Sequence, residues 1–239
     1  MLKKALVTGS GVGIGRAIAL DLASKGFDIA FHYNKSAEAA NQGVQEATTY
    51  SIKSIALQAD ITKPEQAQSL VENAAAQLGG LSVIVNNVGN YLRKPISKTS
   101  TKEWQEVINS NLNATFYITK AALPYLKAAN GARIVNFACA SAQNIAARRT
   151  NAAYIIAKTG IIIYTKSLAV ELIKDKITVN VVSPGVAENS WDVEEMIPKL
   201  PAKRPATLSE INNGVWFFIN PNSDYITGQV LEVSGGWNL

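Results

Sequence analysis

Short runs of β-branched and aromatic residues alternate with longer helical patterns along nearly the whole chain, and this alternation limits the fold more than any other feature. Strands are predicted at residues 4–8, 27–33, 52–59, 81–86, 133–137, 177–182 and 229–233. Helices are predicted between them at residues 14–25, 37–50, 65–78, 101–128 and 152–173. Strands that alternate with helices favour a doubly wound parallel α/β sheet of about seven strands with helices on both faces.

The chain length and the segments between the predicted elements favour one α/β domain over residues 1–239. A chain of 239 residues lies within the range of a single domain. No linker rich in Pro, Gly or Ser, no internal repeat and no low-complexity tract divides it. Ser100 with Glu103, and Thr207 with Glu210, have the capping-box pattern of helix starts. In a sheet of this kind ligands bind at the carboxyl ends of the strands, so functional residues are expected there.

Composition favours a protein of the reducing cytoplasm. One cysteine, Cys139, excludes an internal disulfide, and one histidine leaves no cluster of metal ligands, so no metal site is expected. The net charge is +5, but the basic residues form no dense stripe, which disfavours nucleic acid as a partner. The start of the chain resembles a signal peptide until Thr8 and the following glycines interrupt it. No run approaches the roughly 18 apolar residues of a membrane span.

A glycine-rich segment directly follows the first predicted strand. Residues 8–15 read Thr-Gly-Ser-Gly-Val-Gly-Ile-Gly. Glycines let the backbone turn tightly and approach a pyrophosphate, which then lies at the N-terminus of the following helix. The general fingerprint G-x-G-x-x-G fits in no register, whereas T-G-x-x-x-G-x-G fits through Thr8, Gly9, Gly13 and Gly15. The segment therefore predicts a dinucleotide site.

Tyr154 and Lys158 are four residues apart in a predicted helix, so their side chains share one face. The pKa of a free tyrosine is about 10. A neighbouring ammonium group, together with an oxidised nicotinamide, would lower that pKa. The pair then predicts a general acid for carbonyl reduction or a base for alcohol oxidation. By itself this spacing is a weak pattern, because it also arises by chance in surface helices.

Further segments, in chain order, turn these two patterns into a resemblance that covers nearly the whole chain. Asn-Asn-Val-Gly at 86–89, Asn111, Ser141 thirteen positions before Tyr154 (154 − 141) and Ser-Pro-Gly-Val at 183–186 resemble segments of the short-chain dehydrogenase/reductase family. The resemblance implies a single-domain, Rossmann-type fold.

The resemblance also implies a role for each reacting group. The Ser141 hydroxyl would orient the substrate carbonyl, and Tyr154 would act as acid or base. Lys158 would hold the ribose hydroxyls and tune the tyrosine, and Asn111 would hold a water in a proton relay. Cys139, between two alanines, is interpreted as a packed small residue. His32 is interpreted as a strand residue near the cofactor.

The resemblance assigns a nicotinamide dinucleotide to residues at the carboxyl edge of the sheet. These are Thr8, Gly9, Ser10, Gly13, Ile14, Gly15, Asn34, Lys35, Ser36, Asp60, Ile61, Asn87, Val88, Gly89, Tyr154, Lys158, Pro184, Gly185 and Val186. An acidic residue after the second strand would hold a ribose 2′-hydroxyl and repel a 2′-phosphate. The chain instead has Lys35 and Ser36 there, which favours NADP(H). Val12 stands where many NADP-preferring relatives carry a basic residue, so NAD(H) stays an alternative.

The substrate is expected under a variable lid at residues 187–205, where Trp191 would contact it together with Ser141 and Tyr154. The pattern is closest to the 3-oxoacyl-[acyl-carrier-protein] reductases. That resemblance implies a 3-oxoacyl thioester, free or carried on acyl carrier protein. Basic residues expected around the cleft suit an anionic partner: Arg148, Arg149, Lys199, Lys203 and Arg204. Val170 is a departure, because well-known members carry a basic residue there.

Three alternatives stay open. Residues 32–36 suggest a pteridine reductase, and a reductase of small ketones fits the same reacting groups. A non-catalytic NADP(H)-binding sensor is the alternative from another class of protein, against which Ser141, Tyr154 and Lys158 argue. The long helices predicted at 101–128 and 152–173 resemble those that pair between subunits in the family, which implies a homotetramer or a homodimer.

Overall fold

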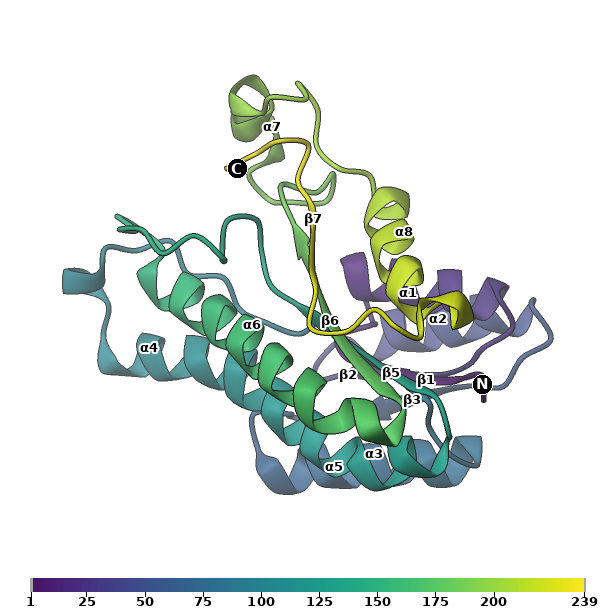
Figure 1. Cartoon of the computed structure of the whole chain (residues 1–239). Coiled ribbons are helices and arrows are strands. Elements are labelled where there is room, and N and C mark those ends of the chain that lie inside the picture. Colours follow the sequence, from purple (N-terminus) through teal and green to yellow (C-terminus); the bar gives the residue numbers. More distant parts are fainter. Residues whose placement is uncertain (1, 239) are drawn as a thin grey trace.

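Seven parallel strands form the central sheet of the computed structural model, which describes residues 2–238 (Figure 1). The strands are β1 (Lys4–Val7), β2 (Asp28–Tyr33), β3 (Ser54–Gln58), β4 (Val83–Asn86), β5 (Ala132–Phe137), β6 (Ile177–Pro184) and β7 (Val230–Val233). Their order is β3-β2-β1-β4-β5-β6-β7. The doubly wound fold predicted from the alternating pattern is confirmed. The end residues of the predicted domain, 1 and 239, lie outside the described part.

Helices cover both faces of the sheet (Figure 1). They are α1 (Gly13–Ser24), α2 (Ala37–Thr48), α3 (Pro64–Leu78), α4 (Thr101–Ile108), α5 (Ala114–Ala128), α6 (Ala152–Leu172), α7 (Val193–Met196) and α8 (Leu208–Ile219). The capping boxes predicted at Ser100 and Thr207 are both present, at the starts of α4 and α8. Each satisfies backbone N–H groups that a helix start would otherwise leave unpaired.

The helix predicted at residues 101–128 is not continuous. A π-helical turn, Asn109–Asn113, separates α4 from α5. Such turns add a residue to the helical repeat and commonly occur at functional sites. Hydrophobic periodicity could not predict this turn, because the chain is helical and amphipathic on both sides of it.

The core consists of two apolar layers, one on each face of the sheet. Successive side chains of a strand point to opposite faces, so Ile84 of β4 packs toward α3, α5 and α6, whereas Val83 and Val85 pack toward α1 and α8. Every residue of β4, β5 and β6 is buried. Burial on both faces explains why these strands read as nearly continuous apolar runs.

The strand order reverses direction beside β1, which pairs with β2 on one side and β4 on the other. In doubly wound sheets the crevice at such a reversal, at the carboxyl ends of the strands, is where ligands bind. The fold therefore directs attention to the segments that follow β1, β4, β5 and β6.

One helical stretch, Ala152–Asp175, is long and apolar enough to cross a membrane by length and composition, and half of its apolar window is buried. Leu168 and Leu172 of this stretch lie in the core layer beneath the sheet. Core packing thus accounts for the buried part of this stretch, whereas Ile156, Ile163 and Val170 stay exposed.

Candidate active site

The glycine-rich loop is held against β4 by the side chain at its start. Thr8 Oγ1 donates to the carbonyl oxygen of Val85 at 3.3 Å and accepts from the backbone N–H of Asn87 at 3.0 Å. A Cβ at Gly15 would collide with the carbonyl group of Gly9, so α1 begins against the loop with no room for a side chain. This close approach leaves the loop and the first turn of α1 able to hold a pyrophosphate, as the motif predicts.

His32 joins the glycine loop to two strands. Its Nδ1 accepts a hydrogen bond from the backbone N–H of Gly9 at 3.0 Å, and its Nε2 lies 3.0 Å from the carbonyl oxygen of Ala59. An acceptor at Nδ1 and a donor at Nε2 require the neutral imidazole. Burial lowers the pKa of His32, which keeps that neutral form.

The Ser10 hydroxyl is part of the same arrangement. It donates to the carbonyl oxygen of Val7 at 2.8 Å and accepts from the backbone N–H of His32 at 2.9 Å, and Ser10 is 0% exposed. Both hydrogen-bonding functions of the hydroxyl are thus used inside the loop, and the cofactor contact expected at Ser10 stays a prediction.

The segment after β2 lies beside the glycine loop and is exposed. A Cβ at Gly11 would lie 3.5 Å from the Cβ of Ser36, and Asn34, Lys35 and Ser36 are all exposed. Lys35 is thus on the surface next to the predicted pyrophosphate site.

The neighbouring residues after β3 differ in exposure. Asp60 accepts from the backbone N–H of Thr62 at 3.1 Å and from its hydroxyl at 2.6 Å, which fixes this carboxylate at the edge of the sheet. Ile61 is buried in the core, so its side chain serves packing.

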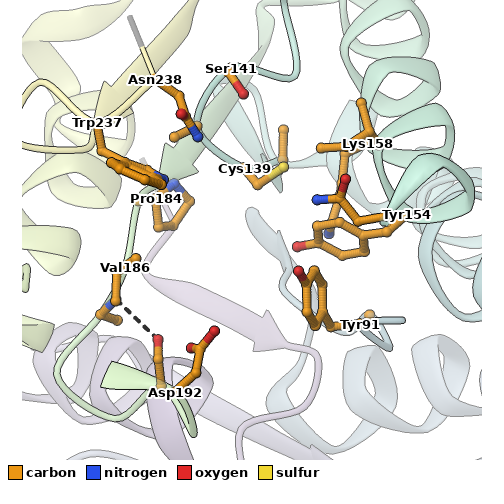
Figure 2. Close-up of a pocket in the computed structure, with 18 of the residues that line it drawn as sticks. Tyr91, Cys139, Ser141, Tyr154, Lys158, Pro184, Val186, Asp192, Trp237 and Asn238 are labelled. Carbon is orange, nitrogen blue, oxygen red and sulfur yellow. Dashed lines mark hydrogen bonds between the residues drawn. The ribbon is translucent and has the colours of Figure 1, made fainter. Parts of the chain in front are cut away.

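Tyr154 and Lys158 lie on the face of α6 that looks into the site (Figure 2). Lys158 is 3% exposed and its Nζ donates to the carbonyl oxygen of Phe137 at 2.9 Å. The same Nζ lies 5.5 Å from the centroid of the Tyr154 ring. Burial lowers the pKa of Lys158 to about 8.

In the protein alone the pKa of Tyr154 moves opposite to the expected direction. Burial is the largest cause and raises the pKa of this hydroxyl. The expected lowering assumed the positive charges of the lysine and of an oxidised nicotinamide. Burial disfavours a phenolate because the charged form loses its hydration in the interior, and the neighbouring Cys139 and Tyr91 raise the pKa further.

Asn111 occupies the π-helical turn, and its amide is held from two sides. Nδ2 donates to the carbonyl oxygens of Asn90 at 3.0 Å and Val107 at 2.9 Å. Oδ1 is buried without a partner. A Cβ at Gly89 would collide with this oxygen and would lie 3.2 Å from the Nζ of Lys158, so Gly89 separates the two groups. Asn111 therefore presents an unpaired acceptor on the lysine side of the site, as its predicted role requires.

Cys139, and not Ser141, lies against Tyr154. Figure 2 shows the Cys139 side chain on the side of the Tyr154 hydroxyl, and both residues line the cavity. Figure 2 shows Ser141 on the far side of Cys139 from Tyr154. Ser141 has a left-handed backbone (φ 63°), and its N–H donates to Glu232 Oε1 at 3.1 Å. Ser141 also lines the cavity, so its substrate-orienting role stays a prediction. Cys139 packs against the small apolar cluster of Ala138, Ala142, Ile162 and Val181, as expected, and in addition lines the cavity.

The position of Cys139 nearer to Tyr154 than Ser141 has a physical cause in the loop between β5 and α6. A count of thirteen residues back from Tyr154 assumes a particular length for this loop. The chain turns at Ser141, where the Arg148 side chain donates to the Ser141 carbonyl oxygen at 2.8 Å. The side chain that reaches Tyr154 consequently comes from two residues nearer the end of β5.

A cavity of about 650 Å³ at the carboxyl end of the sheet is lined by Ile14, Cys139, Ser141, Tyr154 and Lys158. Pro184 at the end of β6 and the following Gly185 and Val186 form one wall, next to Trp237 and Asn238. Sequence reasoning missed Trp237 as a cavity residue, because no pattern relates the chain end to the site.

The lid and the loop after β4 close the other side of the cavity. Trp191 lines it but remains 73% exposed. Glu195 of α7 lies 3.7 Å from the guanidinium of Arg93. Tyr91 stacks edge-on against Tyr154, with ring centroids 4.9 Å apart. Tyr91 was also missed, although its position two residues after the 86–89 motif placed it at the strand ends.

Comparison with known proteins agrees with this geometry. A family model described as enoyl-(acyl carrier protein) reductase matches residues 9–238. The 3-oxoacyl-[acyl-carrier-protein] reductase FabG of Staphylococcus aureus is 34% identical, over 99% of this chain and 98% of its own. The hydroxynaphthalene reductase-like protein Arp2 of Metarhizium anisopliae is 33% identical, over 98% of this chain and 94% of its own. This chain belongs to the short-chain dehydrogenase/reductase family.

Solved structures of the short-chain dehydrogenase/reductase type superpose closely. A blue fluorescent protein from a metagenomic library, in complex with NADPH, has a TM-score of 0.93 at 33% identity, over 99% of this chain and 98% of that one. A short-chain dehydrogenase from Burkholderia cenocepacia, in complex with NADP, has a TM-score of 0.93 at 30% identity, with the same coverage. The protein is thus an NAD(P)-dependent oxidoreductase that acts on CH–OH and C=O groups.

Proposed function

We propose that this protein reduces the ketone of a 3-oxoacyl thioester, free or carried on acyl carrier protein, with NADPH as the hydride donor. The observation that carries the proposal is that Tyr154 and Lys158 line one cavity together with Ile14 of the first turn of α1. Asn111 is buried behind that lining, and Gly89 separates it from Lys158. The name of the Staphylococcus aureus relative supports the choice of substrate.

The chain's own groups suit proton delivery to a carbonyl oxygen. A bound NADPH would supply the hydride, held by the glycine loop and by Lys158. Burial keeps the Tyr154 hydroxyl protonated, which favours its role as the acid. The buried Asn111 Oδ1 can accept a hydrogen bond from a water that returns protons to this side of the site.

The preference for NADPH rests on the segment after β2. Lys35 and Ser36 are exposed beside the glycine loop, and no carboxylate stands in that segment to repel a 2′-phosphate. The bound NADPH and NADP of the two similar structures support the same choice.

The basic residues around the cavity give partial support to an acyl-carrier partner. Lys199 pairs with Glu195 at 2.8 Å and Arg204 pairs with Glu210 at 2.7 Å, so two of these charges are already compensated. Arg149 is exposed, and Arg148 lines the cavity. We place the enzyme in the cytoplasm, where acyl thioesters and NADPH occur together.

The test is turnover by the purified protein. NADPH oxidation is followed with 3-oxoacyl thioesters, pteridines and small ketones, and NADH is compared. Tyr154→Phe should lower kcat by at least about a hundredfold, because it removes the general acid, and should leave NADPH binding intact.

Tyr50→Phe, at an exposed tyrosine, is the matched control and should keep full activity. If no carbonyl compound oxidises either cofactor while NADPH still binds, the non-catalytic sensor replaces the reductase. If pteridines are reduced and thioesters are not, the substrate assignment is wrong.

A further inference from the structure

The contact between Cys139 and Tyr154 places a thiol in the reacting part of the cavity. Cys139 lines the cavity together with Tyr154 and Lys158, and Figure 2 shows its side chain between Ser141 and the Tyr154 hydroxyl. A substrate oxygen that takes its proton from that hydroxyl must approach within hydrogen-bond reach of Tyr154. It therefore also lies beside the sulfur.

The charges around Cys139 leave the thiol protonated. Lys158 and Arg148 face it and favour the thiolate, and Glu232 opposes them. Burial outweighs these charges and raises the pKa of Cys139 to about 11. The group next to the substrate oxygen is thus an S–H, which is a weak hydrogen-bond donor compared with a hydroxyl.

We propose that the Cys139 thiol is the second side chain in contact with the substrate oxygen, and that this weak donor makes the site selective for electron-poor carbonyl groups. The proposal rests on the reductase function proposed above and names the side chain that tunes it. In the reaction the hydride from NADPH adds to the carbonyl carbon, the C=O π bond breaks, and the oxygen takes the proton of Tyr154. Cys139 donates a hydrogen bond and keeps its proton throughout.

Selectivity follows from the strength of that donor. A strong hydrogen-bond donor aimed at a developing oxyanion changes kcat by about a hundredfold or more. With a weak donor in its place, the oxyanion that forms from a simple ketone is stabilised little. A carbonyl group that carries a second carbonyl on the adjacent or next carbon is already polarised, so its reduction depends less on stabilisation by a hydrogen-bond donor. The substrates that suit the site are therefore 1,2-dicarbonyl compounds and 3-oxo thioesters.

The decisive measurement is kcat for a simple ketone and for a 1,2-diketone, in wild type, Cys139→Ser, Cys139→Ala and Ser141→Ala. Cys139→Ser should raise kcat for the simple ketone by about tenfold, and by no more than about threefold for the diketone. Cys139→Ala should lower kcat for both more than Ser141→Ala does. The proposal is overturned if Cys139→Ser changes both substrates equally, or if Ser141→Ala causes the larger loss.

A second measurement does not depend on turnover. Because the chain has one cysteine, methyl methanethiosulfonate labels only Cys139, and its rate at pH 9 is read by mass spectrometry. In the presence of NADP⁺, the diketone or its alcohol should slow labelling at least fivefold. This ratio of labelling rates corresponds to a free energy of about 1 kcal/mol. Unchanged labelling overturns the contact. Absence of turnover with protected Cys139 would instead refute the reductase function and leave the contact standing.

Discussion

Lys158 is an ammonium group held in the interior, and its burial opposes folding at neutral pH. The folded-state pKa of about 8 lies below the model value of 10.5. Between these two values the unfolded chain binds a proton that the folded chain does not, so stability rises with pH across this window. Below pH 8 the full cost of burying the charge is present.

Removal of this charge should therefore stabilise the protein while it abolishes activity. We expect Lys158→Met to raise the free energy of unfolding at pH 7 by on the order of 2 kcal/mol, after the lost hydrogen bond to Phe137 is counted. This gain in the free energy of unfolding should shrink as the pH rises from 8 toward 10.5. Urea unfolding of both proteins at pH 7 and pH 9.5 measures the gain.

Lys166→Met, at an exposed position of the same helix, serves as the comparison and should show neither the gain nor its pH dependence. A destabilised Lys158→Met at pH 7 would mean that the contact with the Phe137 carbonyl outweighs the burial of the charge. Site residues that cost stability are common where activity requires them.

At the scale of elements, His32 connects β2, β3 and the loop that opens α1. Its two hydrogen bonds cross from one element to the next, so it sets the position of Gly9 relative to the sheet. Neutral His32 is needed for both bonds. Because burial lowers its folded-state pKa below the model value of 6.5, the unfolded chain takes up a proton first as the pH falls. The stability from His32 is complete above pH 6.5 and is lost as the pH falls through the folded pKa.

His32→Phe keeps the volume and removes both bonds. We expect a loss of about 1–3 kcal/mol in the free energy of unfolding at pH 7.5, since the Gly9 N–H is left unpaired, and a weaker affinity for NADPH. The difference from wild type should narrow at pH 5. Chemical denaturation and NADPH fluorescence titration at both pH values provide the test. An unchanged NADPH affinity would show that His32 does not position the glycine loop for cofactor binding.

For the molecule as a whole, α6 carries an apolar stripe that the described chain leaves uncovered. Ile156, Ile163 and Val170 recur every seven residues on this helix and are 50%, 63% and 82% exposed. Phe116 of α5 lies beside them, with its ring centroid 5.9 Å from that of Tyr164. An exposed apolar face of this kind indicates a protein–protein interface. The exposed apolar face therefore supports the homodimer or homotetramer that the family resemblance implies.

Ile163→Glu with Val170→Glu should convert the assembly to smaller species, because two carboxylates would be buried unpaired at the interface. Light scattering coupled to size-exclusion chromatography measures the molar mass of the assembly. Lys166→Glu, at an exposed polar position on the same helix, is the comparison. A monomeric wild type would refute the proposed assembly and require another explanation for the stripe.

Patterns that depend on neighbours along the chain were sufficient for much of this protein. The alternation of strands and helices, both capping boxes, the glycine loop and the Tyr154–Lys158 pair follow from local periodicity and local hydrogen bonding, which any short segment carries with it. The partner of Tyr154 was not open to such reasoning. The length and turn of the loop after β5 decide whether Cys139 or Ser141 lies nearer the hydroxyl. That path is set by a contact with Arg148 within the loop and by a contact with Glu232, 91 residues away in the sequence. The direction of the Tyr154 pKa likewise depended on burial, which arises only when the helices and the sheet close around the site.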